Sequence, residues 1–410
     1  MTGPARKAAR ANGGLRGWLS VMMITNAIVP DQLGGLQRYV RELAASLVQR
    51  DVEVTVVARR FSPELPLREL ADDGVRIHRF DVVGRDHRLY AARYPVSSVR
   101  AVAAAVRAHR GIVHVHYPAQ GIAPAILNTR YVHTFHAPAS KEVLPEQRNR
   151  YRLPALARRP MVSAVRAAER LVASRSVATI VLTDYMRGEL AALSRSAAGR
   201  AEIIPGGIDP AVFSPGPGMN TPFASAGDPL LFTARRLVPR TGVRELVRAM
   251  PAIRARLPSA HLAVAGDGPL RADIEADISR LHLRDSVRLL GRISDHDLVA
   301  WYRAASLFVI PTQELEGFGI STIEALACGT PAVGTSVGAI PEVLAPIDPR
   351  LLARGPHASD LAEAVVSLCK EPSLLDRLAA TARGHVVPRL TWQSVTDRHL
   401  ALYERANHTH

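Results

Sequence analysis

The sequence has 410 residues, a length typical of two or three domains rather than one. Hydrophobic residues make up 47% and charged residues 22%, as in ordinary globular proteins. No apolar run approaches the roughly 18 residues that a membrane-spanning helix needs, and no apolar signal-peptide segment follows the basic residues 1–17. The two cysteines, Cys328 and Cys369, suit neither a disulfide framework nor a metal site. We therefore expect a cytoplasmic protein.

The net charge of +15 is concentrated in the first half of the chain. Residues 1–200 contain 31 Lys and Arg against 15 Asp and Glu, which gives +16, whereas residues 201–410 contain 21 against 22, which gives −1. Two explanations stay open: an arginine-preferring genome, or a first half that meets a membrane surface or a phosphorylated substrate. Nucleic acid is disfavoured, because aromatic residues make up only 5% and no nucleic-acid-binding motif is present.

Short apolar runs alternate with amphipathic segments along the chain, which predicts parallel sheets covered by helices. In the first half we predict strands at 20–25, 53–58, 75–80, 112–116, 131–135 and 179–183, and a helix at 36–50. In the second half we predict strands at 230–234, 261–265, 286–290, 307–310 and 332–335, followed by a helical stretch at 373–407.

The two series of strands predict an α/β fold of two Rossmann-like, doubly wound domains that face each other across a cleft. Pro, Gly and Ser are frequent between the two series, which indicates a connection between independent cores. The expected parts are a disordered basic tail (1–17), an N-terminal domain (18–208), a linker (209–229), a C-terminal domain (230–388) and a helix that packs back toward the N-terminal domain (389–410).

The most informative segment is Glu316–Glu324, which follows an apolar strand and opens a helix. A Gly-Phe-Gly turn at a helix N-terminus offers backbone N–H groups and a partial positive charge to an anion. Glu324 lies about one helical turn into the helix, so both carboxylates face the same side. Because carboxylates suit hydroxyl groups better than phosphate, the segment predicts recognition of a sugar and a ribose.

A second segment points to an anion independently. Arg235, Arg236, Arg240 and Thr241 follow the strand 230–234 and precede a helix. Guanidinium groups just past the end of a strand suit bidentate contacts with phosphate. Weaker signals come from the glycine turn at Gly266 and Gly268 and from the loop at Arg292, each of which follows a predicted strand.

In the first half, Gly34 and Gly35 stand where a Rossmann domain keeps its phosphate-binding turn, although a purely structural turn is an equal alternative. His116, His133 and His136 gather near the ends of two predicted strands. No carboxylate has metal-ligand spacing from them, so we predict no metal. For His116 a functional and a structural role stay equally open.

These motifs resemble those of glycosyltransferase family 4 (glycosyl transferases group 1), whose members are retaining enzymes of the GT-B fold. The resemblance covers about residues 20–405. It implies that Glu316 holds hydroxyl groups of the donor sugar and that Glu324 holds the ribose. It also implies that the backbone amides of Gly317, Phe318, Gly319 and Ile320 meet the sugar and the diphosphate.

The family pattern of Gly-Arg-Leu, three residues and Lys-Gly is only partly matched. Arg236 matches the arginine, but Arg235 stands for the glycine and Thr241 for the lysine. Either Arg235 or Arg240 supplies the missing charge, or the diphosphate is held less firmly. The resemblance further places Gly35 at the donor diphosphate and His136 beside the transferred sugar, and it places Gly266, Gly268 and Arg292 at the nucleotide.

The implied activity is that of a retaining hexosyltransferase that uses no metal or other cofactor. It moves a sugar from a nucleotide-sugar (UDP-, GDP- or other) to an acceptor hydroxyl, with His136, Arg236 and Glu316 as catalytic residues, in glycan, glycolipid or glycosylated-metabolite biosynthesis. The acceptor stays open, with anionic and lipid-linked compounds both admissible, and the enzyme is expected in the cytoplasm or on the inner face of the cell membrane. A noncatalytic nucleotide-sugar-binding protein and a nucleotide-sugar epimerase of the same fold are the alternatives.

Overall fold

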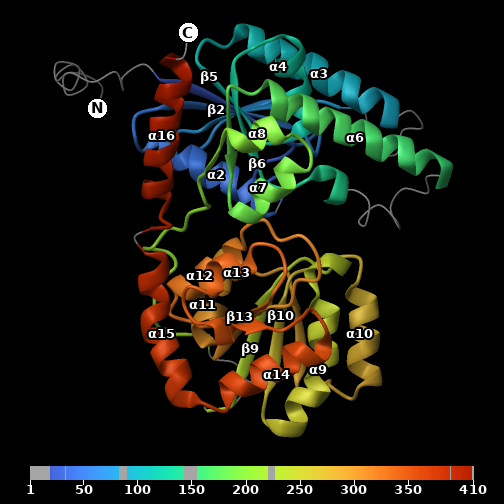
Figure 1. Ribbon diagram of the computed structural model, residues 1–410, viewed down its shortest axis with the longest axis vertical. Helices are drawn as coiled ribbons and strands as arrows, with labels where there is room; N and C mark the ends of the chain where they lie inside the picture. Colours follow the sequence, from blue (N-terminus) through green and yellow to red (C-terminus); the bar gives the residue numbers. More distant parts are fainter. Residues whose placement is uncertain are drawn as a thin grey trace, which may run out of the picture.

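The structure is a computed structural model that describes residues 19–32, 34–82, 90–142, 155–219, 227–387 and 389–408. The chain folds into two α/β halves, one above the other in Figure 1, each built on its own sheet. The basic tail predicted for residues 1–17 lies outside the described residues. The halves correspond to the two series of strands that the sequence predicts.

The N-terminal half is built on a sheet that has eight strands within the described residues. These are β1 (Ser20–Ile24), β2 (Glu53–Arg59), β3 (Arg68–Leu70), β4 (Arg76–Phe80), β5 (Ile112–Val115), β6 (Tyr131–Phe135), β7 (Ala178–Val181) and β8 (Ala201–Ile203). Their order across the sheet is β3-β4-β2-β1-β5-β6-β7-β8, and every neighbouring pair is parallel except β3 with β4. The order reverses between β1 and β5, the place where such sheets bind ligands.

Helices cover both faces of this sheet. Met22 and Ile24 of β1 join the apolar core beneath α3, α4 and α6, while Val21 and Met23 join the core beneath α2. This alternation follows from the two-residue period of a strand. The helices of this half are α2 (Gly35–Val48), α3 (Tyr90–Ala108), α4 (Pro118–Ile126), α6 (Ala155–Arg175), α7 (Asp184–Ala191) and α8 (Arg195–Gly199).

The C-terminal half has a parallel sheet in the order β11-β10-β9-β12-β13-β14. Its strands are β9 (Leu230–Ala234), β10 (His261–Ala265), β11 (Val287–Gly291), β12 (Leu307–Ile310), β13 (Ala332–Thr335) and β14 (Leu352–Ala353). Its helices are α9 (Val243–Arg256), α10 (Arg271–Arg280), α11 (Asp295–Ala304), α12 (Ile320–Ala327), α13 (Ile340–Leu344), α14 (Ala358–Cys369) and α15 (Pro372–Val386), with 3-10 turns at Pro239–Thr241 and Pro349–Leu351.

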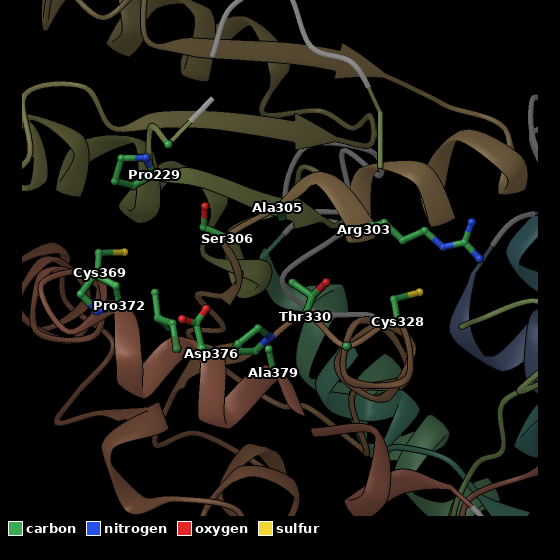
Figure 2. Close-up of a pocket in the computed structure, with 14 residues that line it drawn as sticks. Pro229, Arg303, Ala305, Ser306, Cys328, Thr330, Cys369, Pro372, Asp376 and Ala379 are labelled. Carbon is green, nitrogen blue, oxygen red and sulfur yellow. The ribbon is translucent and has the colours of Figure 1, made fainter. Parts of the chain in front are cut away.

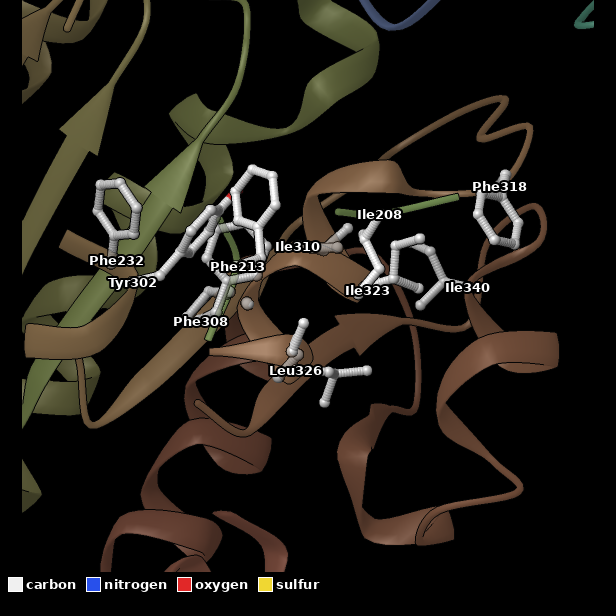
Figure 3. Close-up of a cluster of buried hydrophobic side chains, with 14 of the residues drawn as sticks. Ile208, Phe213, Phe232, Tyr302, Phe308, Ile310, Phe318, Ile323, Leu326 and Ile340 are labelled. Carbon is white, nitrogen blue, oxygen red and sulfur yellow. The ribbon is translucent and has the colours of Figure 1, made fainter. Parts of the chain in front are cut away.

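Aromatic packing fixes α11 and α12 on the second sheet. Figure 3 shows the ring of Tyr302 of α11 near those of Phe232 of β9 and Phe308 of β12, with Ile323 and Leu326 of α12 in the same cluster. The Tyr302 and Phe308 rings meet edge to face, with centroids 5.2 Å apart. These ring contacts hold α11 against β9 and β12.

The chain crosses between the halves twice, and the two crossings lie side by side. Ile208 pairs with Thr391, and the backbone N–H of Ile208 donates to Leu390 O at 2.8 Å. The second crossing divides the predicted helix 373–407 into α15 and α16 (Trp392–His408), which line one side of the molecule in Figure 1. Helix α16 packs on α2, where Tyr39 Oη and His399 Nε2 are 3.2 Å apart.

The described part of the predicted linker is attached to the C-terminal half. Arg303 of α11 donates to Ser214 O at 2.6 Å, and Phe213 is buried in the core. Gly218 lies so close to Ala304 that an added Cβ would be 2.7 Å from its backbone. Residues 209–219 are thus packed onto α11, whereas residues 220–226 lie outside the described residues.

Candidate active site

The loop between β12 and α12 carries the first predicted carboxylate, and a neighbouring turn fixes its course. The Ala339 N–H donates to Glu316 O at 2.9 Å. Gly338 has φ of 64°, and a Cβ added there would lie 2.7 Å from the backbone N and O of Glu316. Only glycine fits such a close approach in that conformation. The Gly338 turn therefore holds Glu316 at the carboxyl end of the second sheet.

Glu316 is paired with an arginine from the end of β9. Its carboxylate accepts a hydrogen bond from Arg235 Nη2, which also lies 3.1 Å from Thr312 Oγ1. Burial raises the pKa of Glu316, but the charges of Arg235 and Arg240 and a hydrogen bond from the Gly319 backbone outweigh it, so the pKa is lowered. The side chain is therefore an ionised hydrogen-bond acceptor at neutral pH.

The segment after β9 and the glycine turn after β10 run side by side. The Arg235 N–H donates to Ala265 O at 2.9 Å and the Leu237 N–H donates to Asp267 O at 3.1 Å. A Cβ on Gly266, which has φ of 125°, would lie 2.0 Å from Arg235 O, and one on Gly268 would lie 2.5 Å from Leu237 O. Backbone packing alone accounts for these two glycines. Their predicted contact with the nucleotide remains a prediction.

The hydroxyl of Thr241 faces backbone oxygens of its own segment. The side chain is buried and donates toward Arg236 O at 2.6 Å and Val238 O at 2.8 Å. A hydroxyl has a single proton, which these two backbone oxygens share, and the contact closes the turn at Pro239–Thr241. Thr241 thus supports the turn that carries Arg240, and its predicted contact with the donor remains a prediction.

The two other arginines of this segment, Arg236 and Arg240, differ in their surroundings. Arg240 donates to Leu315 O at 3.3 Å and lies 3.4 Å from Glu142, a residue of the N-terminal half. Arg236 is exposed. Arg240 therefore stands beside the loop that carries Glu316. Arg235, by contrast, forms an ion pair with Glu316 itself.

His136 follows β6 and lies directly opposite this loop. A Cβ added to Gly317 would be 2.7 Å from the backbone oxygen of His136, so the two halves touch here. Thr183 Oγ1, at the start of α7, donates to Gly317 O at 3.0 Å. The structure thus brings His136 and the Glu316 loop together, as the sequence predicts.

Histidines surround His136 in the N-terminal half. His116 Nδ1 and His136 Nε2 are 3.1 Å apart, and the Tyr39 ring meets the His136 ring edge-on. Burial, together with neighbouring histidines, lowers the pKa of His136 to about 3. A neutral ring donates or accepts hydrogen bonds but carries no positive charge at neutral pH. A neutral His136 suits hydrogen bonding to a sugar hydroxyl, and both expected roles of this residue remain predictions.

His133 and Gly35 differ from His136 in their surroundings. His133 is buried within β6, where burial lowers its pKa to about 4, and its Nδ1 has no hydrogen-bond partner among the residues that the structure describes. Gly35, the first residue of α2, is exposed, and an added Cβ would meet no atom within 4 Å. No contact among the described residues therefore requires glycine at position 35.

Glu324 is nearly covered by two side chains. Arg38, from the N-terminal half, donates to its Oε1 at 3.0 Å, and the Tyr302 hydroxyl donates to its Oε2 at 2.9 Å. Sequence reasoning missed Arg38 because 286 residues separate it from Glu324, and no local pattern reports such a contact. The predicted contact between Glu324 and ribose remains a prediction.

The other predicted donor residues frame the same region. Phe318 is buried against Gly206, where an added Cβ would lie 3.1 Å from its ring, and Ile320 is the first residue of α12. Arg292 follows the last residue of β11 and is exposed. Among the residues that the structure describes, no group of three His, Cys, Asp or Glu side chains has the geometry to hold a metal ion.

A cavity of about 350 Å³ lies away from these residues, beside the C-terminal end of α12. Figure 2 shows Cys328, Thr330 and Ser306 on one side of it and residues of α15 on the other. It is separated from the Glu316 loop by the length of α12, so it is not part of the candidate site. No described helix combines the length and apolar character required to cross a bilayer.

Known sequences match both halves of the chain. Residues 33–212 match the family described as Glycosyltransferase Family 4, and residues 221–385 match that described as Glycosyl transferases group 1. The chain is 30% identical over 404 residues to a D-inositol 3-phosphate glycosyltransferase of Actinosynnema mirum, with 91% of this chain and 92% of the relative covered. Over 179 residues it is 30% identical to a GDP-mannose-dependent monoacylated alpha-(1-6)-phosphatidylinositol monomannoside mannosyltransferase of Corynebacterium glutamicum, covering 42% of this chain and 45% of that relative.

Solved structures show the same arrangement of two sheets. Sucrose-phosphate synthase from Thermosynechococcus elongatus superimposes with a TM-score of 0.78 at 23% identity, covering 95% of this chain and 99% of the other. At this level of identity the likeness supports the fold, while the sequence relatives support the family. The chain therefore belongs to glycosyltransferase family 4 and is a glycosyltransferase of the two-domain GT-B fold.

Proposed function

We propose that this glycosyltransferase moves a hexose from a nucleotide-sugar to a hydroxyl of an anionic acceptor, with retention of the anomeric configuration and without a metal. The C-terminal half binds the donor and the N-terminal half binds the acceptor. The observation that carries the proposal is the meeting of the Glu316 loop, the arginines after β9 and His136 at one junction.

Each part of that junction suits one part of a nucleotide-sugar. Ionised Glu316 accepts hydrogen bonds from hydroxyl groups of the sugar. The start of α12 offers backbone N–H groups to the diphosphate, and Arg236 and Arg240 add positive charge. Neutral His136 hydrogen-bonds a sugar hydroxyl from the opposite side.

In the proposed mechanism the protein stabilises the leaving diphosphate and provides no nucleophile of its own. As the bond between the anomeric carbon and the diphosphate breaks, negative charge grows on the departing oxygen, and the arginines and helix N-terminus stabilise it. The departing oxygen takes the proton of the acceptor hydroxyl, which attacks on the same face, so the configuration is retained. Glu316 is paired with Arg235 and serves hydroxyl recognition rather than nucleophilic attack.

Phosphate on the acceptor is favoured by two observations. The relatives from Actinosynnema mirum and Corynebacterium glutamicum are named for acceptors that contain phosphate: inositol 3-phosphate and a phosphatidylinositol mannoside. The first 200 residues carry 31 Lys and Arg against 15 Asp and Glu. Opposite charge favours encounter with such an acceptor. We therefore propose a phosphorylated polyol, free or lipid-linked, as the acceptor class.

The test is a transfer assay after a binding screen. A thermal-shift panel of UDP- and GDP-sugars identifies the donor, and mass spectrometry then follows transfer to inositol 3-phosphate and to phosphatidylinositol. Glu316→Ala is expected to lower transfer by at least about a hundredfold, in the range reported for lost transition-state hydrogen bonds. Tight donor binding without transfer to any acceptor would favour the noncatalytic alternative. Product of inverted configuration would refute retention.

A further inference from the structure

The first turn of α2 sends one side chain across the junction into the C-terminal half. Arg38 Nη1 donates to Glu324 Oε1 at 3.0 Å, and Arg38 Nη2 forms an ion pair with Asp295 at the start of α11. The Arg38 side chain is 25% exposed and that of Glu324 only 4%. One guanidinium of the N-terminal half thus joins two carboxylates of the other half.

The Glu324 carboxylate depends on a counter-ion because it is buried. Burial raises the pKa of Glu324, although the charge of Arg38 and the hydroxyl of Tyr302 act to lower it. The nearby Asp295 raises it further. A buried carboxylate without a cation takes up a proton rather than stay charged. Arg38 is therefore the group that favours the ionised form of Glu324.

The remaining hydrogen-bonding capacity of Glu324 matches a vicinal diol. A carboxylate accepts about four hydrogen bonds, two on each oxygen. Arg38 occupies one position on Oε1 and Tyr302 one position on Oε2. Among the contacts of the described residues, one position on each oxygen is left, which is the number of acceptors that the 2′ and 3′ hydroxyls of a ribose need.

We propose that Arg38 is a positioning residue of the donor site that keeps Glu324 ionised and oriented for the ribose hydroxyls, so that this subsite is complete only while the two halves are in contact. The inference rests on the proposed function, because Glu324 meets a ribose only if the chain binds a nucleotide-sugar. Its consequence is that donor binding and contact between the halves stabilise each other.

Calorimetric titration with UDP, GDP and ADP tests the inference, using whichever diphosphate the wild type binds. Arg38→Ala is expected to weaken binding by at least about tenfold, since Glu324 without its counter-ion takes up a proton and accepts the ribose hydroxyls less well. Arg38→Lys keeps the charge and retains most of the affinity. Arg41→Ala is the matched control, because Arg41 lies on the same helix but pairs with Asp73 of its own half.

A nucleotide without ribose hydroxyls separates positioning from a general structural effect. Because Arg38 acts through Glu324 on those hydroxyls, the wild type and Arg38→Ala are expected to bind the 2′,3′-dideoxy diphosphate equally. Arg38→Ala combined with Glu324→Gln is expected to bind no more weakly than Glu324→Gln alone. If Arg38→Ala fails to fold, Arg38→Gln serves in its place in both comparisons.

Two results would overturn the inference: equal affinity of the wild type and the Arg38 variant for the ordinary diphosphate, or the same penalty for the dideoxy analogue. Neither result would contradict the proposal that the C-terminal half binds a nucleotide-sugar. If the wild type binds none of the three diphosphates, the proposed function fails instead.

Discussion

Gly35 differs from the other glycines of the site in what surrounds it. Cβ atoms added to Gly266, Gly317 or Gly338 would collide with the backbone, whereas one added to Gly35 meets no atom of the described residues within 4 Å. Folding alone therefore explains the first three but not Gly35. If the space beside Gly35 belongs to the donor, glycine is needed there for binding and not for stability.

We predict that Gly35→Val leaves the Tm close to that of the wild type, because the side chain has room at the start of a helix. We expect kcat/KM for the donor to fall by about tenfold or more, since the valine occupies space that the diphosphate needs. Gly384→Val in α15 is the control, as its added Cβ also meets no atom. A large drop in Tm for Gly35→Val alone would show that the glycine is structural.

At the scale of elements, the start of α7 binds to α13 of the other half. The Glu342 carboxylate accepts hydrogen bonds from the backbone N–H groups of Asp184 at 2.9 Å and Tyr185 at 2.6 Å. These N–H groups have no partner within their own helix, and the helix N-terminus is partly positive. The contact therefore stabilises the arrangement in which His136 meets Gly317.

We predict that Glu342→Ala lowers kcat/KM by about two- to tenfold, because a carboxylate at a helix N-terminus contributes roughly 0.3–1 kcal/mol and more where partly buried. Small-angle scattering is expected to show a larger radius of gyration without donor, as the open arrangement gains population. Glu363→Ala provides the comparison, since Glu363 pairs with Arg256 within the C-terminal half. An unchanged radius and unchanged kinetics for Glu342→Ala would contradict a role in closure.

The sequence predicted elements well and contacts between halves poorly. All eleven predicted strands coincide with observed strands to within two residues, since apolar runs bounded by polar turns are a local signal. The strands that the sequence did not predict are β3, β8 and β14. Each has only two or three residues, which is too short for a recognisable apolar pattern. The predicted helix 373–407 is two helices because the chain crosses between halves at its centre.

In the candidate site, too, local motifs were predictable from the sequence and long-range contacts were not. Glu316 and its loop were predictable because strand, glycines and helix follow one another in sequence. The pairing of Glu316 with Arg235 and that of Glu324 with Arg38 join residues 81 and 286 positions apart, so only the folded chain reveals them. The contacts of the Thr241 hydroxyl with Arg236 O and Val238 O likewise appear only in the folded chain, because no motif describes them.

At the scale of the whole molecule, the N-terminal half and α16 share a group of five histidines, of which four are buried and His136 is half-buried. Burial lowers the pKa of all five members, to about 4 for His133 and His399 and to about 3 for His136. The other members, His114 and His116, are lowered well below the usual value. The unfolded chain binds protons at these sites below about pH 6.5, whereas the folded chain stays neutral until a much lower pH.

We therefore predict that stability falls as the pH drops from about 6.5 toward 4, because the unfolded state gains protons that the folded state does not. Each histidine contributes up to about 1.4 kcal/mol per pH unit in that window. Urea-unfolding midpoints followed by circular dichroism at several pH values measure the slope. His133→Leu is expected to flatten it and His296→Ala, at a 93% exposed side chain, to leave it unchanged. A midpoint independent of pH would contradict the neutral, buried state of the cluster.

One layer of the N-terminal half concentrates positive charge. Helices α3, α4 and α6 lie together on one face of the sheet (Figure 1), and the single acidic residue in their described length, Glu169, is buried. Three arginines of α6 donate to backbone carbonyls rather than to carboxylates. Exposed arginines of the layer are Arg93, Arg100, Arg107, Arg159, Arg166, Arg170 and Arg175. Two large apolar side chains, Val96 and Ile126, are also exposed there.

We predict that this layer binds anionic lipid bilayers, which would bring the enzyme to a lipid-linked acceptor. Sedimentation with phosphatidylcholine vesicles, with and without phosphatidylglycerol, is expected to show binding only to the anionic set and less binding at high salt. At roughly 1 kcal/mol for each basic residue near the surface, Arg100→Glu with Arg166→Glu should weaken binding by tenfold or more. Arg284→Glu with Arg377→Glu changes the net charge equally in the other half, so equal weakening by both pairs would mean that total charge, and not this layer, governs the association.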